Sequence, residues 1–260
     1  MNIVMKCSVC GNLVEEYVTQ TVLKIYNINY YRCTNCSFIE AQKPRYWLKK
    51  AYKQAIISAD TGLLSRNITL SKMTAILLLL TGKKDSQVLD YAGGYGVMTR
   101  LLRDIGLDCY WQDRYAKNIF VRGFESKEKH YDVVCSFELF EHLDNPLKEI
   151  GDILNIYSPD MLIFSTTLHD GDPGKDWWYF VPEGGQHISF YTRKSLQIIA
   201  DKLGYHLTTN GSFYHIFSKI YISSSINIIF SKLWMVLSII LPIFYKSKTF
   251  SDHLSYSQKK

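Results

Sequence analysis

The sequence has little charge and no apolar run before its first cysteine, and these two absences narrow the classes of protein that we expect. Charged residues make up 21% of the 260 residues, against 47% hydrophobic residues, which excludes a disordered chain. No apolar run precedes the first cysteine, Cys7, so we expect no secretory signal and a cytoplasmic location. The formal net charge of +6 favours anionic partners only weakly. We expect one globular domain with a small appendage.

Six cysteines are present, and four of them form two Cys-x-x-C pairs. The members of these pairs are Cys7, Cys10, Cys33 and Cys36. In a chain without an export signal, such pairs indicate a metal site rather than disulfides. Strand-forming residues at 18–25 and 28–31, with a turn near Asn27 and Asn29, predict a hairpin that brings the pairs together. Four thiolates suit tetrahedral Zn²⁺ with no open position, so we predict a structural zinc ribbon over residues 1–42.

The other two cysteines have a simpler explanation. Cys109 and Cys135 lie in apolar, strand-like runs. Free cysteines in such runs behave as small hydrophobic residues, so we expect both to be buried rather than to act as ligands or nucleophiles.

A glycine-rich loop follows the first strand of the next segment. Residues 87–91 predict a strand, residues 92–96 read Ala-Gly-Gly-Tyr-Gly, and residues 97–105 predict a helix. This succession lets the backbone approach a nucleotide-like ligand closely. The next predicted strand, 107–112, runs into Asp113. A carboxylate at that position can accept hydrogen bonds from both hydroxyls of a ribose.

Strands and helices alternate through the rest of the central segment, which predicts an α/β sheet with its ligand at the carboxyl ends of the strands. A helical lead-in is expected at 45–80. Asn210-Gly211 predicts a hairpin and therefore an antiparallel last strand. The remaining strands are expected at 131–137, 161–166, 205–209 and 213–219, and a helix is expected from about Pro146.

The glycine loop and its surroundings resemble class I S-adenosylmethionine-dependent methyltransferases. The first motif of that family has the form acidic-x-Gly-x-Gly-x-Gly, and residues 90–96 match it except that Ala92 replaces the first glycine. The resemblance implies S-adenosyl-L-methionine as cofactor and a Rossmann-like, seven-stranded sheet with an antiparallel last strand, here preceded by the zinc ribbon. The cofactor-binding residues that it implies are Asp90, Ala92, Gly93, Gly94, Gly96, Asp113, Phe137 and Glu138.

One departure from that family concerns the middle of the sheet. Only 17 residues separate Asp113 from Tyr131, so the usual second helix must be short or missing. We expect residues 120–124 to supply the remaining strand.

A narrower resemblance extends over most of the chain. Bacterial methyltransferases of surface-glycan and secondary-metabolite sugar pathways are similar in having an N-terminal ribbon, a Phe-Glu-x-Phe-Glu-His-Leu segment (residues 137–143) and a Gly-Gln-His-Ile-Ser segment (residues 185–189). This resemblance implies O-methylation of a sugar or another small molecule. Deoxysugar C-methyltransferases share the ribbon and the Glu-His pair but carry a further C-terminal domain, for which this chain is too short.

Two histidines are the candidate general bases. A sugar hydroxyl is a poor nucleophile at neutral pH and benefits from proton removal. His142 follows a strand end, with Glu141 beside it to orient the ring, and His187 is the second candidate. His187 lies in an aromatic, glycine-bearing stretch typical of a substrate-covering loop. The candidate substrate-binding residues of that stretch are Trp177, Trp178, Tyr179 and Gln186.

Two other functions compete with this reading. An RNA methyltransferase would bind RNA through the ribbon, and RNA binding needs clustered basic residues. The segment between the cysteine pairs holds only Lys24 and Arg32 as bases, against Glu15 and Glu16, which disfavours nucleic acid as a partner. A non-catalytic binding protein that keeps the fold is the second alternative, which the replacement at Ala92 allows.

The C-terminal stretch is strongly apolar. Residues 220–245 hold one charge, Lys232, and lysines flank them on both sides. Such a segment suits a helix lying on an anionic membrane through residues 220–248, at the inner face of the membrane. Packing on the domain or on a second subunit, as in a homodimer, is the alternative, and a membrane span is a third. We therefore divide the chain into the ribbon, a methyltransferase domain at 43–219 whose lead-in covers 43–84, and a tail at 220–260.

Overall fold

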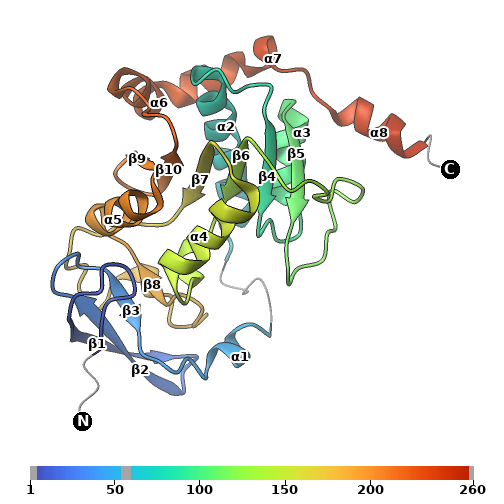
Figure 1. Ribbon diagram of the computed structural model, residues 1–260. Helices are drawn as coiled ribbons and strands as arrows, with labels where there is room; N and C mark the ends of the chain where they lie inside the picture. Colours follow the sequence, from blue (N-terminus) through green and yellow to red (C-terminus); the bar gives the residue numbers. More distant parts are fainter. Residues whose placement is uncertain (1–4, 54–59, 258–260) are drawn as a thin grey trace. The chain divides into compact units, whose positions relative to one another are not determined.

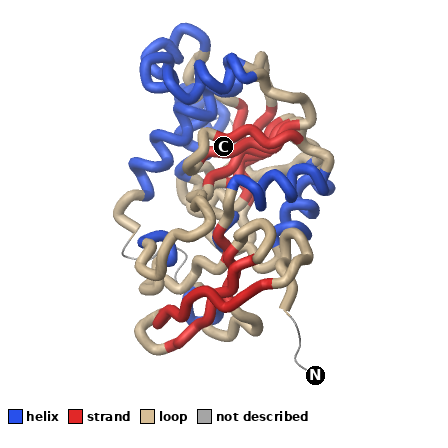
Figure 2. The backbone as a smooth tube through the Cα atoms, turned by 90° about the vertical axis from the view of Figure 1, so that its left-hand side faces the viewer, coloured by secondary structure: helices blue, strands red, loops and turns tan. Residues whose placement is uncertain are grey.

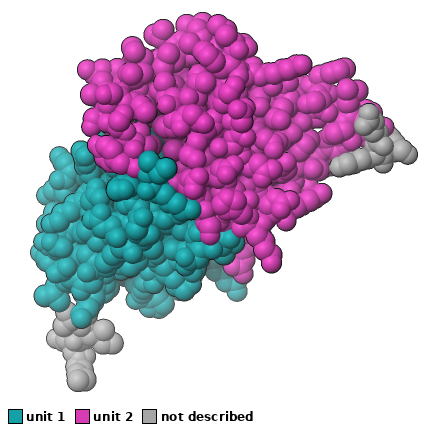
Figure 3. Space-filling model, turned by 45° about the horizontal axis from the view of Figure 1, so that its top comes forward, with its two compact units in different colours: residues 1–59, 137–156, 164–220 teal, residues 60–136, 157–163, 221–260 magenta. Residues whose placement is uncertain are grey.

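The computed structural model describes residues 5–53 and 60–257 and divides into two compact units (Figure 3). Unit 1 comprises residues 1–59, 137–156 and 164–220. Unit 2 comprises residues 60–136, 157–163 and 221–260. Each unit is therefore assembled from segments that are far apart in the sequence.

Unit 1 contains a four-stranded antiparallel sheet in the order β1-β2-β3-β8 (Figure 1). Its strands are β1 (Val14–Val22), β2 (Tyr26–Cys33), β3 (Ile39–Ala41) and β8 (Ser189–Phe190). Figure 2 shows β1 and β2 as a pair of long red strands. The ribbon predicted at 1–42 is therefore extended by a strand from a distant part of the chain, with Ile39 opposite Phe190.

The hairpin between β1 and β2 turns at residues 23–25, and Asn27 and Asn29 lie within β2. Leu23 and Lys24 adopt left-handed backbone angles, with φ of 52° and 63°. Such angles are unusual for these residues, which is why the sequence pointed to the asparagines instead. The N–H of Leu23 donates to the carbonyl of Pro182 at 2.8 Å, so a contact outside the hairpin supports the turn.

The core of unit 1 is aromatic and joins the ribbon to residues 177–190. Tyr30 of β2 packs against Phe180, with ring centroids 5.1 Å apart, and against Phe190 at 5.8 Å. Trp47 is fully buried and its Nε1 donates to the carbonyl of Gly185 at 2.9 Å. Burial of each such ring stabilises the fold by about 1.5–3 kcal/mol, so the ribbon and this stretch are expected to form one cooperative unit.

The remainder of unit 1 carries a hairpin and a well-capped helix. Strands β9 (His206–Thr209) and β10 (Tyr214–Ser218) pair antiparallel around Asn210-Gly211, as the sequence predicted. Helix α5 (Arg193–Leu203) begins with a reciprocal capping box between Thr192 and Ser195, which satisfies two backbone N–H groups of its first turn.

Unit 2 is built around a central parallel strand. Strand β4 (Gln87–Tyr91) pairs in parallel with β5 (Asp108–Gln112) on one side and with β6 (Val133–Ser136) on the other. Val88 and Leu89 are neighbours on this strand and both are fully buried, which is typical of a parallel strand covered on both faces. Helix α3 (Val97–Ile105) follows β4 directly after the glycine loop, as predicted.

The larger sheet has six strands in the order β5-β4-β6-β7-β10-β9, where β7 is Met161–Ser165. The prediction of seven strands is not met in the described part of the chain. The expected strand at 120–124 is replaced by a single parallel bridge between Trp111 and Glu125. Trp111 donates its N–H to the carbonyl of Phe124 at 2.8 Å. The chain between Asp113 and Tyr131 is too short to hold the usual helix. Within it, only the residues around Glu125 pair with strand β5.

The helical lead-in is shorter and more divided than the expected span of 45–80. It contains α1 (Leu48–Ala51) and α2 (Leu63–Leu80), and residues 54–59 of the predicted helix lie outside the described residues. Helix α2 is apolar around most of its circumference, with a run of buried residues from Met73 to Leu78. It is thus a core helix of unit 2.

The C-terminal stretch is helical. It contains α6 (Ser224–Leu237), η3 (Ser238–Ile240), α7 (Leu241–Phe244) and α8 (Thr249–Ser257). By length and composition, the segments Leu63–Leu80 and Ser224–Phe244 could each cross a membrane. Their burial differs: 44% of the first segment is buried inside the molecule, but only 11% of the second. The second segment therefore presents most of its apolar side chains to the surroundings.

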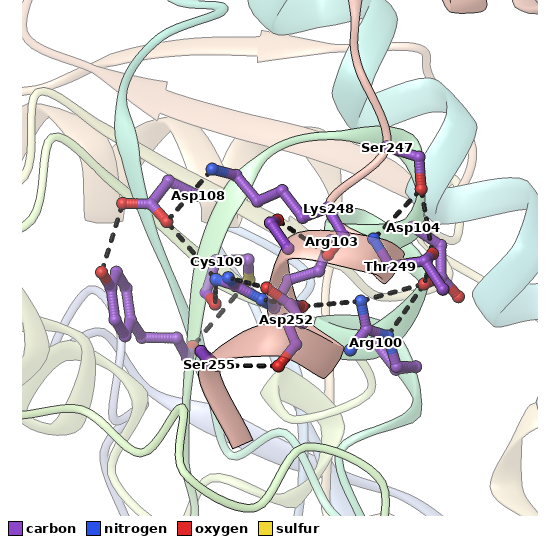
Figure 4. A network of polar contacts seen from close by, with 12 residues as sticks. Arg100, Arg103, Asp104, Asp108, Cys109, Ser247, Lys248, Thr249, Asp252 and Ser255 are labelled. Atoms are coloured by element: carbon purple, nitrogen blue, oxygen red, sulfur yellow. Dashed lines mark hydrogen bonds and ion pairs between the residues drawn. The ribbon is translucent and has the colours of Figure 1, made fainter. Parts of the chain in front are cut away.

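Helix α8 is tied to α3 by buried ion pairs (Figure 4). Arg103 donates to both carboxylate oxygens of Asp252, at 2.8 and 2.6 Å, and Arg100 donates to the same group at 2.9 Å. Burial acts to raise the pKa of Asp252, but the hydrogen bonds from the two guanidinium groups hold it below its ordinary value. The last helix is consequently fixed to unit 2 by specific charge pairing, whereas α6 packs on α2 through apolar contacts.

The other helices are short or connect strands. They are η1 (Phe140–His142), α4 (Pro146–Tyr157) and η2 (Trp178–Phe180).

Candidate functional site

The glycine loop between β4 and α3 has a left-handed backbone at three positions. The φ angles of Ala92, Gly94 and Gly96 are 58°, 54° and 91°. Glycine adopts such angles without steric cost, whereas alanine does not. A Cβ placed on Gly94 would meet no atom within 4 Å. The backbone at Gly94 is thus open on the side where a ligand could approach.

The other two glycines of the loop face protein atoms. A Cβ on Gly93 would lie 2.5 Å from the Oδ2 atom of Asp90, and a Cβ on Gly96 would lie 2.7 Å from the Cγ2 atom of Val121. These positions need glycine because the chain packs tightly there. We predicted from the sequence that all three glycines bind the ligand. Among them, only Gly94 has free space where a Cβ would lie.

Asp90 is buried at the end of β4 and holds the start of α3. Its Oδ2 accepts hydrogen bonds from the N–H and the hydroxyl of Thr99, at 3.1 and 2.7 Å. Burial raises the pKa of Asp90 to about 6, although the hydrogen bonds from Thr99 act in the opposite direction. A carboxylate that accepts hydrogen bonds from the first turn of a helix also interacts favourably with the helix dipole. Asp90 therefore has a structural task in addition to any contact with a ligand.

Asp113 connects the two loops at the ends of β4 and β5. Its Oδ2 accepts from the N–H of Gly94 at 3.0 Å, and its Oδ1 accepts from the N–H groups of Tyr115 and Ala116 at 2.6 and 2.7 Å. The two residues that sequence reasoning placed on one ligand are thus in direct contact. A single ligand lying on the glycine loop would meet both.

Two residues of this site were missed at the sequence level. Trp111 donates from Nε1 to the carbonyl of Gly94 at 2.9 Å. Asn118 accepts from the N–H of Val121 at 3.0 Å and donates to Glu125 at 2.7 Å. Trp111 could have been suspected from its place on the predicted strand beside the loop. Asn118 lies in an irregular loop, where no pattern marks it.

A second constellation lies in unit 1 and consists of Glu141, His142 and His187. Each of them offers a ligating atom, and these atoms lie within 4.8 Å of one another. Glu141 is 1% exposed, and the imidazole rings of His142 and His187 are 5.1 Å apart at an angle of 82°. The structure thus brings together the three residues that the sequence proposed as a catalytic group.

Both histidines are oriented by backbone carbonyls. Nδ1 of His142 lies 3.0 Å from the carbonyl of Gln186, and Nδ1 of His187 lies 2.7 Å from that of Tyr179. A carbonyl only accepts, so these contacts assign the proton to Nδ1, and Nε2 is then the ring nitrogen that carries no proton in the neutral form. Burial lowers the pKa of His142 to about 4, against the opposing effect of the Gln186 carbonyl. His142 is therefore neutral at neutral pH.

Phe137 and Glu138 follow β6 and belong to unit 1. Glu138 has a left-handed backbone with φ of 55°, which is strained for this residue type. Its N–H donates to the hydroxyl of Ser165 at 2.8 Å, and that hydroxyl donates to its Oε1 at 2.7 Å. Phe137 packs near Tyr214, with ring centroids 6.2 Å apart. Ser165 thus supports the strained turn at Glu138.

The four predicted substrate-binding residues differ in exposure. Trp178 is 70% exposed, whereas Tyr179 is buried. The Gln186 side chain donates to the carbonyl of Ala51 at 2.9 Å, and Trp177 packs on Phe190 with ring centroids 5.6 Å apart. These contacts make most of the stretch part of the core. Tyr179 still borders the second constellation, because its ring centroid lies 4.8 Å from that of His187.

The four cysteines of the ribbon form a compact cluster, with ligating atoms within 4.8 Å of one another. The Sγ atoms of Cys7 and Cys36 are 3.7 Å apart, and those of Cys10 and Cys33 are 3.3 Å apart. The N–H of Asn35 points to the sulfur of Cys33 at 3.4 Å. This donor set fits one tetrahedral, thiophilic metal ion. The remaining cysteines, at 109 and 135, are fully buried, as predicted.

Comparisons with known proteins identify the family. A family model described as "Methyltransferase domain" matches residues 66–210, which is more than half of the chain. No curated protein matches the chain.

Several solved structures are similar to part of the chain. The structure titled "Mitomycin 7-O-methyltransferase MmcR" is 15% identical over 66% of this chain and 60% of that chain, with a TM-score of 0.46. The plantazolicin methyltransferase BpumL is 14% identical over 68% and 93%, with a TM-score of 0.45. An O-methyltransferase family protein from Burkholderia thailandensis is 13% identical over 68% of each chain, with a TM-score of 0.43. Likenesses this distant assign no substrate to this chain.

The strain at Ala92 leads to a stability prediction. We expect Ala92→Gly to raise the free energy of unfolding by roughly 0.5–1 kcal/mol, because relief of the left-handed strain exceeds the added freedom of the unfolded chain. Denaturant unfolding measures this change. Ala75→Gly, within helix α2, is the matched control and should lower stability by about 1 kcal/mol or more. A loss of stability in Ala92→Gly would show that Ala92 is not strained.

Proposed function

Since the chain belongs to the methyltransferase-domain family, we propose that it transfers a methyl group from S-adenosylmethionine to a hydroxyl oxygen of a sugar or another small molecule. The acceptor would belong to surface-glycan or secondary-metabolite synthesis. The observation that carries the proposal is the hydrogen bond from the N–H of Gly94 to the carboxylate of Asp113. It places the part of the glycine loop that a ligand can approach beside a carboxylate at a strand end, where such a group can bind a ribose.

The residues of unit 2 fit the methyl donor. We propose that the open face at Gly94 lies against the donor and that Asp113 accepts hydrogen bonds from its ribose hydroxyls. Asp90, Ala92, Gly93 and Gly96 would shape the loop rather than recognise the ligand by side chain. When bound, the donor supplies an electrophilic methyl group on a sulfonium.

The residues of unit 1 fit a hydroxyl acceptor. Methyl transfer forms a C–O bond as the C–S bond breaks, and the hydroxyl proton must leave. We propose that His142 or His187 accepts this proton at Nε2, since Nδ1 of each ring faces a carbonyl. Glu141 would position the pair, and Trp178, with the neighbouring Trp177, Tyr179 and Gln186, would border the acceptor.

RNA is a weaker candidate for the acceptor. Arg32, one of the few basic residues of the ribbon, is paired with Glu15 at 2.8 Å, so its charge is partly neutralised. A sugar C-methyltransferase remains the alternative within the same enzyme class, because it would use the same S-adenosylmethionine site.

We propose the following division of labour along the chain. Residues 1–42 form a structural zinc ribbon, residues 43–219 the methyltransferase domain and residues 220–260 an attachment segment. The four ribbon cysteines would fill all four positions of a tetrahedral zinc ion and leave none for a substrate, which supports a structural rather than a catalytic zinc.

We further propose that the enzyme works in the cytoplasm, at the inner face of the membrane, through residues 220–248. Met235, Ile239 and Ile243 are each more than 60% exposed. From residue 202 to residue 251 the chain contains no aspartate or glutamate but five lysines. An exposed apolar helix whose charged neighbours along the sequence are all lysines complements an anionic lipid surface.

The donor site is tested by removing the ribose-binding carboxylate. Asp113→Ala should weaken S-adenosylmethionine binding at least tenfold in isothermal titration calorimetry, because hydrogen bonds to a charged group contribute about 1.5–3 kcal/mol. Labelled methyl transfer to sugar acceptors should fall with it. Glu128→Ala removes an exposed carboxylate of the same unit and is the control. Unchanged affinity in Asp113→Ala would refute the assignment.

The zinc ribbon is tested by its metal content. The purified chain should contain one zinc ion per molecule by inductively coupled plasma mass spectrometry, and Cys33→Ser should lose it and melt at a lower temperature. Cys135→Ala removes a buried cysteine elsewhere and should keep the zinc. A wild-type chain without zinc, purified without chelators, would contradict the proposal.

Membrane attachment is tested with vesicles. The chain should sediment with vesicles containing phosphatidylglycerol but much less with pure phosphatidylcholine, and added salt should release it. The double variant Met235→Glu, Ile239→Glu should lose most of this binding, whereas Ile25→Glu, at an exposed turn of the ribbon, should not. Equal binding by the double variant would refute the proposal. Self-association that the double variant abolishes, without vesicle binding, would assign the helix to a homodimer.

A further inference from the structure

Glu141, His142 and His187 together form a set of possible metal ligands. A general base needs only one of the two histidines. One carboxylate and two imidazoles offer ligating atoms within 4.8 Å of one another. They come from two segments, the short helix η1 and the loop before β8, so the tertiary structure assembles them. Two histidines with one carboxylate suit divalent first-row metal ions and leave coordination positions open.

The hydrogen bonds that orient the two imidazole rings are of the kind that metal-binding histidines make. A ligating histidine almost always donates its other ring N–H to a carbonyl or carboxylate, which fixes the tautomer and the ring orientation. Here Nδ1 of His142 is 3.0 Å from the carbonyl of Gln186, and Nδ1 of His187 is 2.7 Å from the carbonyl of Tyr179. Both rings thereby carry a proton on Nδ1, which leaves Nε2 as the nitrogen of each ring that can ligate a metal ion.

The loop that carries His187 is itself firmly anchored. The hydroxyl of Tyr30 donates to the carbonyl of His187 at 3.2 Å, and the N–H of Ile188 donates to the carbonyl of Glu141 at 2.8 Å. The second of these bonds connects the two ligand-bearing segments directly. Their separation therefore depends on backbone hydrogen bonding and not on the side chains alone.

We propose that Glu141, His142 and His187 bind one divalent first-row transition-metal ion, apart from the four-cysteine cluster. An octahedral ion held by three protein ligands keeps three positions open, two of which a vicinal diol or catechol can fill. The class of acceptor that this site favours is thus a small molecule with adjacent oxygens. Only this last step rests on the proposed methyltransferase acceptor; the metal site does not.

The reaction balances without any redox step. The acceptor hydroxyl bound to the ion would release its proton more readily, because a divalent ion lowers the pKa of a bound oxygen acid. Nε2 of each histidine would then hold the ion, so the proton would pass to solvent and not to a histidine. The oxygen forms a bond to the methyl carbon as the C–S bond of the sulfonium breaks with its electron pair on sulfur. The ion keeps its charge throughout.

The two metal sites can be distinguished by their donor atoms. Thiolates select zinc, whereas imidazole and carboxylate also accept Mn²⁺. The full-length chain, loaded with one equivalent of zinc so that only the thiolates are filled, is titrated with Mn²⁺ and followed by electron paramagnetic resonance of the free ion; it should bind one Mn²⁺ per molecule. Glu141→Gln and His187→Ala should each weaken this binding at least tenfold while the zinc content stays constant.

A matched control and a folding control accompany the titration. His206→Ala removes an exposed histidine of the same unit and should bind Mn²⁺ like the wild type. Calorimetry with S-adenosylmethionine should give the same affinity for all variants, which shows that they are folded. Absence of stoichiometric Mn²⁺ or Co²⁺ binding in the wild type, or wild-type binding by Glu141→Gln, would overturn the proposal.

The outcomes separate this site from the proposed function. Mn²⁺ binding needs no turnover, so a metal site with no methylation of any hydroxyl acceptor would leave the site in place and overturn the acceptor assignment. Methyl transfer to a hydroxyl without metal binding would retain the proposed function and return the role of base to the histidines.

Discussion

The parallel pairing of β4 with β5 is the interaction on which the donor site depends. The register places Tyr91 opposite Gln112, so the two strands end level with each other. The glycine loop and Asp113 therefore emerge side by side, and the hydrogen bond from Gly94 to Asp113 follows. Trp111 reinforces the same junction by donating to the carbonyl of Gly94. A shift of register by one residue would separate these groups and turn the side chains of β5 to the opposite faces of the sheet.

In unit 1 the corresponding constraint is an aromatic core. Tyr30, Phe180 and Phe190 pack together, and β3 pairs with β8. The ribbon and the loop of His187 thus share one interior. A structural zinc in the ribbon would then act beyond its four ligands, since the strands that it steadies also support the loop carrying a candidate catalytic histidine. The proposed zinc would thereby stabilise the loop of His187 without itself taking part in the reaction.

One error of the sequence interpretation has a clear physical cause. The hairpin turn was placed near Asn27 and Asn29 because asparagine favours turns, yet it forms at Leu23 and Lys24, where the backbone bonds to Pro182. This contact with a residue more than a hundred positions away outweighs the local preference. The seventh strand, which the described residues lack, has a different cause, since the chain between Asp113 and Tyr131 is too short to form a full crossover.

The sequence by itself determined the features that depend on local spacing. Two Cys-x-x-C pairs, a strand followed by a glycine loop and a helix, and the Asn210-Gly211 hairpin each lie within a few residues, and local geometry decides them. Only the tertiary structure decided which groups meet. It assigned Asp90 to Thr99, left only Gly94 with an open face, and brought His187 to Glu141 and His142 across more than forty residues. Such convergence depends on packing and strand pairing between distant segments, which no short-range pattern in the sequence records.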